Sequence, residues 1–215
     1  MVDIITMPDS LYMLSSQKFT VATLNTTSGA SSFNPLIRVD GPSAQFWQVE
    51  MTFIPEQDDQ VDELHRFIMR LKGGKVLARL YDANRGPWGG RTQPRGAGGI
   101  TSTVNIAVAA AAGAETLQLK NLVASQAKAL ASMDHIGIGE NLHAIVVPSP
   151  SDAGGVAGFS IWPPLRQGIA VDDPVNLVLP TGVFQITGGA TDLTIGGGGV
   201  SQPLTLTFIE SPDFT

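Results

Sequence analysis

The chain contains no cysteine, which excludes disulfide bridges, zinc sites with thiolate ligands and cysteine nucleophiles. Charged residues are also few, at 15%, and 13 basic against 19 acidic side chains give a formal net charge of −6. An acidic surface repels a phosphate backbone. The composition therefore disfavours a protein that binds nucleic acid over a broad surface.

Long apolar runs are missing as well. The longest, residues 106–112 (IAVAAAA), is far shorter than the roughly 20 residues that a membrane-spanning helix needs. The first residues, MVDIITMPDS, have no basic flank followed by an apolar stretch, so we expect no signal peptide and no membrane insertion. We expect synthesis and folding in a cytoplasm.

What the chain has instead is 43% apolar residues together with 24 glycines and 14 prolines. The apolar share favours a folded protein over a disordered one. Frequent glycine and proline suit many short strands separated by turns better than a bundle of helices. Composition alone therefore predicts a mainly β fold.

A strand, a helix and a second strand follow one another in the first half. Residues 47–53 (WQVEMTF) alternate between apolar and polar, which is typical of a half-buried strand in an antiparallel sheet. The next segment, 59–72, carries apolar residues at helical spacing, with Asp59 as its expected N-cap and two glycines after its end. Residues 75–81 (KVLARLY) predict a strand.

The rest of the chain is divided by changes of pattern. Short segments bounded by glycine at 101–166 predict an inserted β-rich subdomain, in which 121–131 would also permit a short helix. Strands are expected again in the last part, at 175–179, 182–187, 191–195 and 204–210. The predicted fold is mainly β (α+β). Residues 1–100 and 167–215 would form an antiparallel β-sandwich with one packed helix.

Residues 81–99 (YDANRGPWGGRTQPRGAGG) interrupt this regular pattern with arginines and a tryptophan among glycines and prolines. The segment has neither the GxxxxGK[ST] nor the GxGxxG pattern of phosphate-binding loops. Stacking on single-stranded nucleic acid and a solvated loop stay open as alternatives. Because arginine and tryptophan are enriched at protein interfaces, we expect Arg85, Trp88 and Arg91 to contact a neighbouring subunit.

No residue pattern indicates a reaction centre. The three histidines, His65, His135 and His143, form neither HxH nor HExxH, and GFSIW at 158–162 is not the GxSxG elbow of hydrolases. Paired carboxylates at 58–59, 62–63 and 172–173 are explained by helix capping and a turn, although a glycosidase pair stays open because such residues meet only in the fold. We expect no catalytic residue, no metal site and no cofactor.

The order of these elements resembles a known family, the distal tail proteins of long-tailed bacteriophages, or a closely related tail-tip component. The segments that carry the resemblance run from 45 to 211: WQVEMTFIP, DQVDELHRFIMRLKGG, KVLARLYDANRGPWG, AGAETLQLKNL, MDHIGIGENLHAIV, WPPLR, VLPTGVFQIT and LTLTFIES. The loop positions of the family's aspartate and proline-x-glycine are matched by Asp82, Pro87 and Gly89. Two positions depart from the pattern: Met133 stands where glycine is usual and Gln185 where arginine is usual.

The resemblance implies a structural virion protein with no enzymatic activity. Members of the family form a β-rich hexameric ring at the tail tip, joining the tail tube protein to the hub or baseplate proteins of the host-recognition apparatus. DNA would pass through the lumen without specific binding, which an acidic lumen would favour.

Two other functions are left open by the residues. The first is a carbohydrate-binding module for the host surface, whose groove would be lined by exposed Trp47, Trp88 and Trp162. The second is a cell-wall hydrolase that acts through carboxylates found only in the fold.

Overall fold

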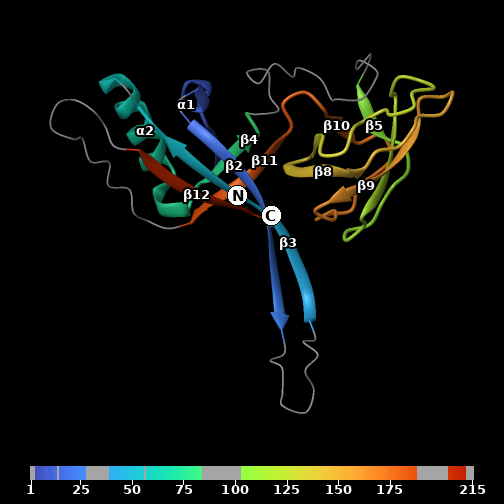
Figure 1. Ribbon diagram of the computed structural model, residues 1–215, viewed down its shortest axis with the longest axis horizontal. Coiled ribbons are helices and arrows are strands. Elements are labelled where there is room, and N and C mark those ends of the chain that lie inside the picture. The colour runs from blue at the N-terminus through green and yellow to red at the C-terminus, as the bar shows by residue number, and fades with distance from the viewer. Residues whose placement is uncertain are drawn as a thin grey trace, which may run out of the picture.

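The computed structural model describes residues 3–13, 15–27, 39–55, 57–83, 103–187 and 203–211. These residues are mostly in strands, as predicted, and form two units that lie side by side, a six-stranded sheet and a closed six-stranded barrel (Figure 1). The predicted β-sandwich is not confirmed, because the described strands of the first unit form a single sheet.

The sheet of the first unit combines both ends of the chain in the order β1-β4-β11-β12-β3-β2. Its strands are β1 (Ile4–Thr6), β2 (Ser15–Thr27), β3 (Val39–Phe53), β4 (Leu77–Tyr81), β11 (Thr181–Thr187) and β12 (Leu204–Glu210). Neighbours are antiparallel except β1 and β4, which are parallel. The strands expected at 182–187 and 204–210 are confirmed, whereas 191–195 lies outside the described residues.

The predicted helix is present as α2 (Asp58–Arg70), followed by a 3-10 turn, η1 (Lys72–Gly74). Its N-cap is Gln57 and not Asp59: the backbone N–H of Gln57 donates to Gln60 Oε1 at 3.2 Å, which closes the first turn. A second helix, α1 (Asp9–Met13), was not predicted. Five residues are too few to show a helical period, so only packing against the sheet identifies it.

One face of the sheet is buried under these helices. The alternation predicted for 47–53 is confirmed: Trp47, Val49, Met51 and Phe53 are at most 1% exposed and form one cluster with residues of α1 and α2. The other face carries polar residues, including Gln48, Glu50 and Thr52 and their β12 partners Thr205 and Thr207. The described helices thus cover one face of the sheet and leave a polar face.

The second unit is a barrel of short strands in the closed order β10-β5-β6-β9-β8-β7. The strands are β5 (Val104–Ile106), β6 (Thr116–Lys120), β7 (His135–Ile138), β8 (Asn141–Val147), β9 (Ala157–Trp162) and β10 (Pro174–Asn176). They enclose a core of their own, with Ile106, Leu119, Ile136 and Ile145 fully buried.

Two sequence expectations in this region need correction. The strand expected at 175–179 does not return to the sheet, because Val175 pairs with Val104 and with Ile138 and so closes the barrel. No helix forms at 121–131, where Asn121 and Ser125 have positive φ values of 65° and 56°. Residues in the left-handed region break a helix whatever their propensity.

Candidate functional site: the hairpin and its root

Strands β2 and β3 form a long hairpin that leaves the body of the protein. Strand β12 pairs with β3 only from Phe53 back to Gln48, whereas β2 and β3 remain paired with each other as far as Thr27 and Val39. The outer part, residues 22–27 and 39–46, is therefore a two-stranded ribbon, which projects beyond both units in Figure 1. We call this outer part the ribbon.

A ribbon of two strands is marginally stable in water by itself. In addition, β2 is the last strand of the sheet, and no described strand pairs with its outer edge. Such an edge presents a row of N–H and C=O groups to which another chain can add a strand. The ribbon and the free edge of β2 together are the feature of this protein most suited to binding a partner.

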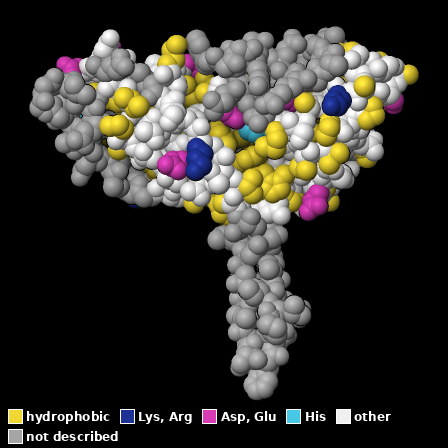
Figure 2. Space-filling model, viewed as in Figure 1, with side chains coloured by type: hydrophobic (Ala, Val, Ile, Leu, Met, Phe, Trp, Pro, Cys, Tyr) yellow, Lys and Arg dark blue, Asp and Glu magenta, His cyan; other side chains and the backbone are white. Residues whose placement is uncertain are grey.

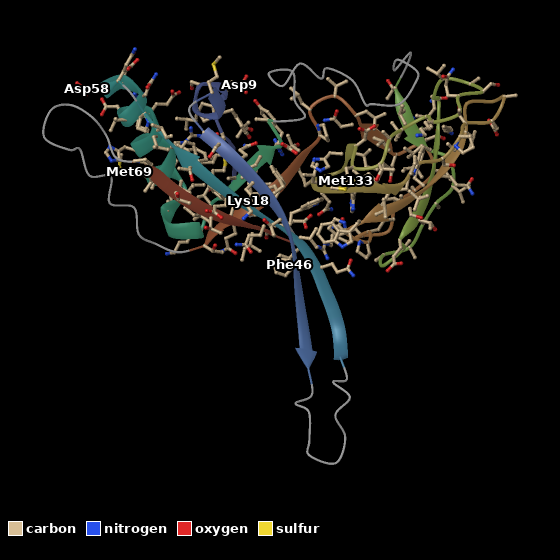
Figure 3. All side chains as sticks on the ribbon, in the orientation of Figure 1. Asp9, Lys18, Phe46, Asp58, Met69 and Met133 are labelled. Atoms are coloured by element: carbon tan, nitrogen blue, oxygen red, sulfur yellow. The ribbon has the colours of Figure 1, made fainter. Side chains whose placement is uncertain are left out.

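The root of the hairpin is held by two side chains. Glu210, the last residue of β12, accepts a hydrogen bond from the Trp47 N–H at 3.1 Å through Oε2. The same Oε2 lies 3.2 Å from Nη2 of Arg166, which follows β9 in the barrel unit. Arg166 Nη2 also donates to the backbone carbonyl of Gln45. Figure 3 labels Phe46, which lies between these two held positions.

Trp47 anchors the same root to the barrel. Its indole Nε1–H donates to the carbonyl of Leu142 in β8 at 2.9 Å. Its ring meets that of Trp162 in β9 edge to face, with centroids 4.5 Å apart. Leu142 belongs to the apolar cluster of the sheet unit, so the core is continuous across the boundary. The barrel is packed firmly on the sheet at the point where the hairpin leaves.

Burial controls the electrostatics of this junction. The side chain of Glu210 is 1% exposed, and burial raises its pKa, although Arg166 and the Trp47 N–H act in the opposite direction. Burial lowers the pKa of His143 in β8 to about 4. At neutral pH His143 is therefore uncharged, and its Nδ1 is 2.8 Å from the Pro163 carbonyl, which makes Nδ1 the protonated nitrogen.

A second ion pair joins the two units away from the hairpin. Arg79 in β4 binds Glu140, in the turn between β7 and β8, with N–O distances of 2.6 and 3.1 Å. The Glu140 carbonyl also accepts a hydrogen bond from Val183 in β11. Both side chains are about one third exposed, so solvent screens this pair more than the pair of Arg166 and Glu210.

Only some of the residues that the sequence analysis singled out lie within the described part of the chain. Arg85, Trp88 and Arg91 lie outside the described residues, as do Pro87 and Gly89. Asp82 is buried, with Oδ2 3.7 Å from His135 Nδ1. The segment that leads into the arginine-rich loop thus starts from the junction with the barrel.

The histidines do not come together. His65 lies on α2, whereas His135 and His143 are buried in the barrel strands β7 and β8. Across the described ranges, no three histidine or carboxylate side chains are grouped to hold a metal ion.

The capping explanation of the first carboxylate pair needs correction, because Gln57 is the N-cap of α2. Asp58 and Asp59 lie in the first turn of α2. Asp172 binds Lys120 at 2.5 Å, and Asp173 accepts a hydrogen bond from the Ala170 N–H.

The aromatic groove required by the carbohydrate-binding alternative is not formed by Trp47. Its side chain is 1% exposed and packs against Trp162, so it offers no open surface for stacking on a sugar. Trp88, the third candidate, lies outside the described residues.

Two cavities open on the barrel unit. One, of about 540 Å³, is lined by residues that include Thr116, Gln118 and Ser160, and no charged residue is among them. The other, of about 500 Å³, is bordered by Asn141, His143 and Arg166. On the face shown in Figure 2, charged side chains are few and scattered among hydrophobic and uncharged polar ones.

No protein-family model matches this chain, and a comparison with curated proteins gives no match. Among the described residues, no helix is long and apolar enough to cross a membrane.

Proposed function

We propose that this chain is a structural virion protein of a long-tailed bacteriophage. It forms a homo-oligomeric ring, expected to be a hexamer, at the distal end of the tail and joins the tail tube to the host-recognition apparatus. The proposal has two supports: the ordered motifs between residues 45 and 211 and the hairpin that projects from the sheet. The single observation that carries it is the ribbon, because two strands without a third need a partner to be stable.

Ring formation requires two different surfaces on each subunit. The sheet supplies two unlike edges: β2, a long strand of 13 residues, and β1, a short strand of 3 residues. We assign the long edge and the ribbon to the contact with one neighbour. The sandwich-like layering expected for a ring-forming domain would then arise between subunits, when the ribbon of one copy packs against the next.

The polar face of the sheet suits a channel through which DNA passes. Its residues are mainly hydroxyl and amide side chains, such as Gln48, Thr52 and Thr207, with Glu50 and Lys18 opposite each other in the register of β2 and β3. Affinity for DNA depends mainly on cations that neutralise phosphates. A face with so few cations would hold DNA weakly and let it slide.

The proposal also assigns the arginine-rich loop, residues 81–99, to a contact between subunits. In this proposal Arg85, Trp88 and Arg91 contact a neighbouring subunit, and Trp88→Ala reduces the share of assembled oligomer in a mass measurement. An unchanged oligomer distribution and normal tail assembly would contradict this part alone.

The main test removes the outer part of the ribbon without disturbing its root. Leu24 and Ala44 face each other in the register, so an Asn-Gly turn can join them in place of residues 25–43. We expect the shortened chain to fold but to lose oligomerisation, measured by light scattering on the purified protein, and to be absent from virions. A matched control replaces Gln118, exposed on the barrel, with alanine and should assemble normally.

Two results would overturn the proposal. One is a full-length chain that is absent from purified tails when they are imaged with a label on this protein. The other is a shortened chain that assembles into tails as efficiently as the full-length chain.

A further inference from the structure

At the root of the hairpin, the side chains of Glu210 and Arg166 bind backbone groups of β3 that have no described strand partner on that side. The ladder between β12 and β3 ends at the pair Ile209 and Gln48. Beyond it, the Trp47 N–H is bound by the Glu210 carboxylate and the Gln45 carbonyl by Arg166. The backbone groups that β12 would have paired, had it continued, are thus satisfied by an ion pair.

The two partners of this ion pair come from different units. Glu210 ends a strand of the sheet, whereas Arg166 lies in the segment after β9 of the barrel. The guanidinium of Arg166 therefore touches the barrel unit, the sheet and the hairpin at once. Another ion pair between the units, Arg79 with Glu140, joins β4 to the β7–β8 turn, away from the hairpin.

We propose that Arg166 is a positioning residue that sets the angle at which the ribbon leaves the body and couples that angle to the position of the barrel. Both contacts are made by one nitrogen of Arg166, Nη2, which is thereby held between the Glu210 carboxylate and the Gln45 carbonyl. Because both acceptors are on or beside β3, movement of the barrel at Arg166 moves the root of the hairpin. This coupling goes beyond the proposed virion role, and its test needs only the isolated chain.

The experiment measures the direction of the ribbon directly. Since the chain has no cysteine, the pair Thr27→Cys and Gln118→Cys can be spin-labelled uniquely, one label at the end of β2 and one on β6 of the barrel. Pulsed electron paramagnetic resonance then gives the distance distribution between them. We expect Arg166→Gln to broaden this distribution and shift its mean relative to the parent protein.

A matched control separates this effect from general loosening. Arg79→Gln removes the ion pair with Glu140, which also joins the units, and should leave the distribution between ribbon and barrel as in the parent. A second label pair, Asp59→Cys with Gln118→Cys, reports the distance from α2 to the barrel and should stay unchanged in Arg166→Gln. Equal broadening in Arg79→Gln and Arg166→Gln would overturn the proposal.

Removal of Arg166 alone leaves the buried Glu210 charge without its partner and threatens folding. The double variant Arg166→Gln with Glu210→Gln avoids this, because no charge remains at the root. We expect it to fold, as judged by circular dichroism, and still to show the broadened distribution. A distribution as narrow as that of the parent in this folded double variant would show that packing, and not the ion pair, sets the angle.

Discussion

The barrel and the sheet differ in their strand edges: the barrel is closed, whereas the sheet is open. The six short strands of the barrel close on themselves through β10, so each strand has two neighbours. The sheet stays open and ends in β2, its outer edge unpaired in the described structure. Closure removes sites for adding strands, whereas an open edge keeps one. In the proposed function, a partner that adds a strand would therefore bind the sheet and its hairpin, and not the closed barrel.

The same contrast applies to the two cores. Each unit has its own apolar cluster, yet Leu142 and Ala144 of the barrel strand β8 belong to the cluster of the sheet. Trp47 and Arg166 add a hydrogen bond and an ion pair at the same boundary. The barrel strands form a closed ring, but part of the barrel surface is buried against the sheet. This contact lies at the root of the hairpin and stabilises it.

The largest expected effect comes from breaking the contact that both units share. Trp47→Ala removes a fully buried ring and the hydrogen bond to Leu142. We expect the free energy of unfolding to fall by about 3–5 kcal/mol, as measured by chemical denaturation. A loss below about 1 kcal/mol, the scale of a typical surface substitution, would show that the units are not coupled through this residue.

The pH dependence of stability tests the burial of His143, which lies on the barrel side of the boundary between the two units. Its pKa is about 4 in the folded protein and about 6.5 when unfolded. The neutral form is favoured by folding, so its contribution is complete above pH 6.5 and is lost as the pH falls toward 4. The full difference amounts to about 3 kcal/mol. Comparison of unfolding free energies for the parent and His143→Gln at several pH values should show this dependence only in the parent.

The exposed ion pair should matter less than the buried one. Arg79→Ala removes the bridge to Glu140, which is open to solvent on both sides. We expect a loss of about 1 kcal/mol or less, which decreases further when salt is added. Thermal unfolding at low and high ionic strength measures both quantities. A salt-independent loss of several kcal/mol would mean that the two units are held together mainly at this edge.

The smallest expected effect is an increase in stability when Met133 of the barrel unit is replaced. Met133 has φ 66°, in the left-handed region that favours glycine, and its side chain is 43% exposed. Met133→Gly relieves this backbone and removes little buried surface. We expect an increase in stability of less than about 1 kcal/mol, visible as a small rise in Tm. A fall in Tm would indicate that the thioether makes a contact that outweighs the strain.

Local patterns predicted a good part of this fold. The alternation in 47–53 identified the buried face of β3, and the apolar spacing after residue 59 identified α2, because both depend on neighbours close in sequence. The glycine-bounded segments of residues 101–166 indicated a β-rich region in the same way, and strands β5 to β9 lie there. Met133, which departs from the glycine usual at this position in the resembled family, has a φ of 66°.

Local sequence patterns could not predict the contacts at the junction between the sheet and the barrel. Arg166 and Glu210 are 44 residues apart, and neither stands in a motif that marks it as an ion-pair partner. Trp47 was a candidate for stacking on a sugar in the carbohydrate-binding alternative, but the fold buries it. Strand signals over residues 17–54 indicated β2 and β3, but they did not show that the two strands continue as a ribbon beyond the end of β12.

The sequence by itself determined the mainly β class, the position of the long helix and which residues of β3 face the core, because hydrophobic period and turn residues act over a few positions. Only the tertiary structure decided that β10 closes a barrel, that β2 is left as an open edge and that Arg166 meets Glu210 at the hairpin root. Those outcomes depend on pairing between segments far apart in the chain, where backbone hydrogen bonds and desolvation select the partner and local sequence does not.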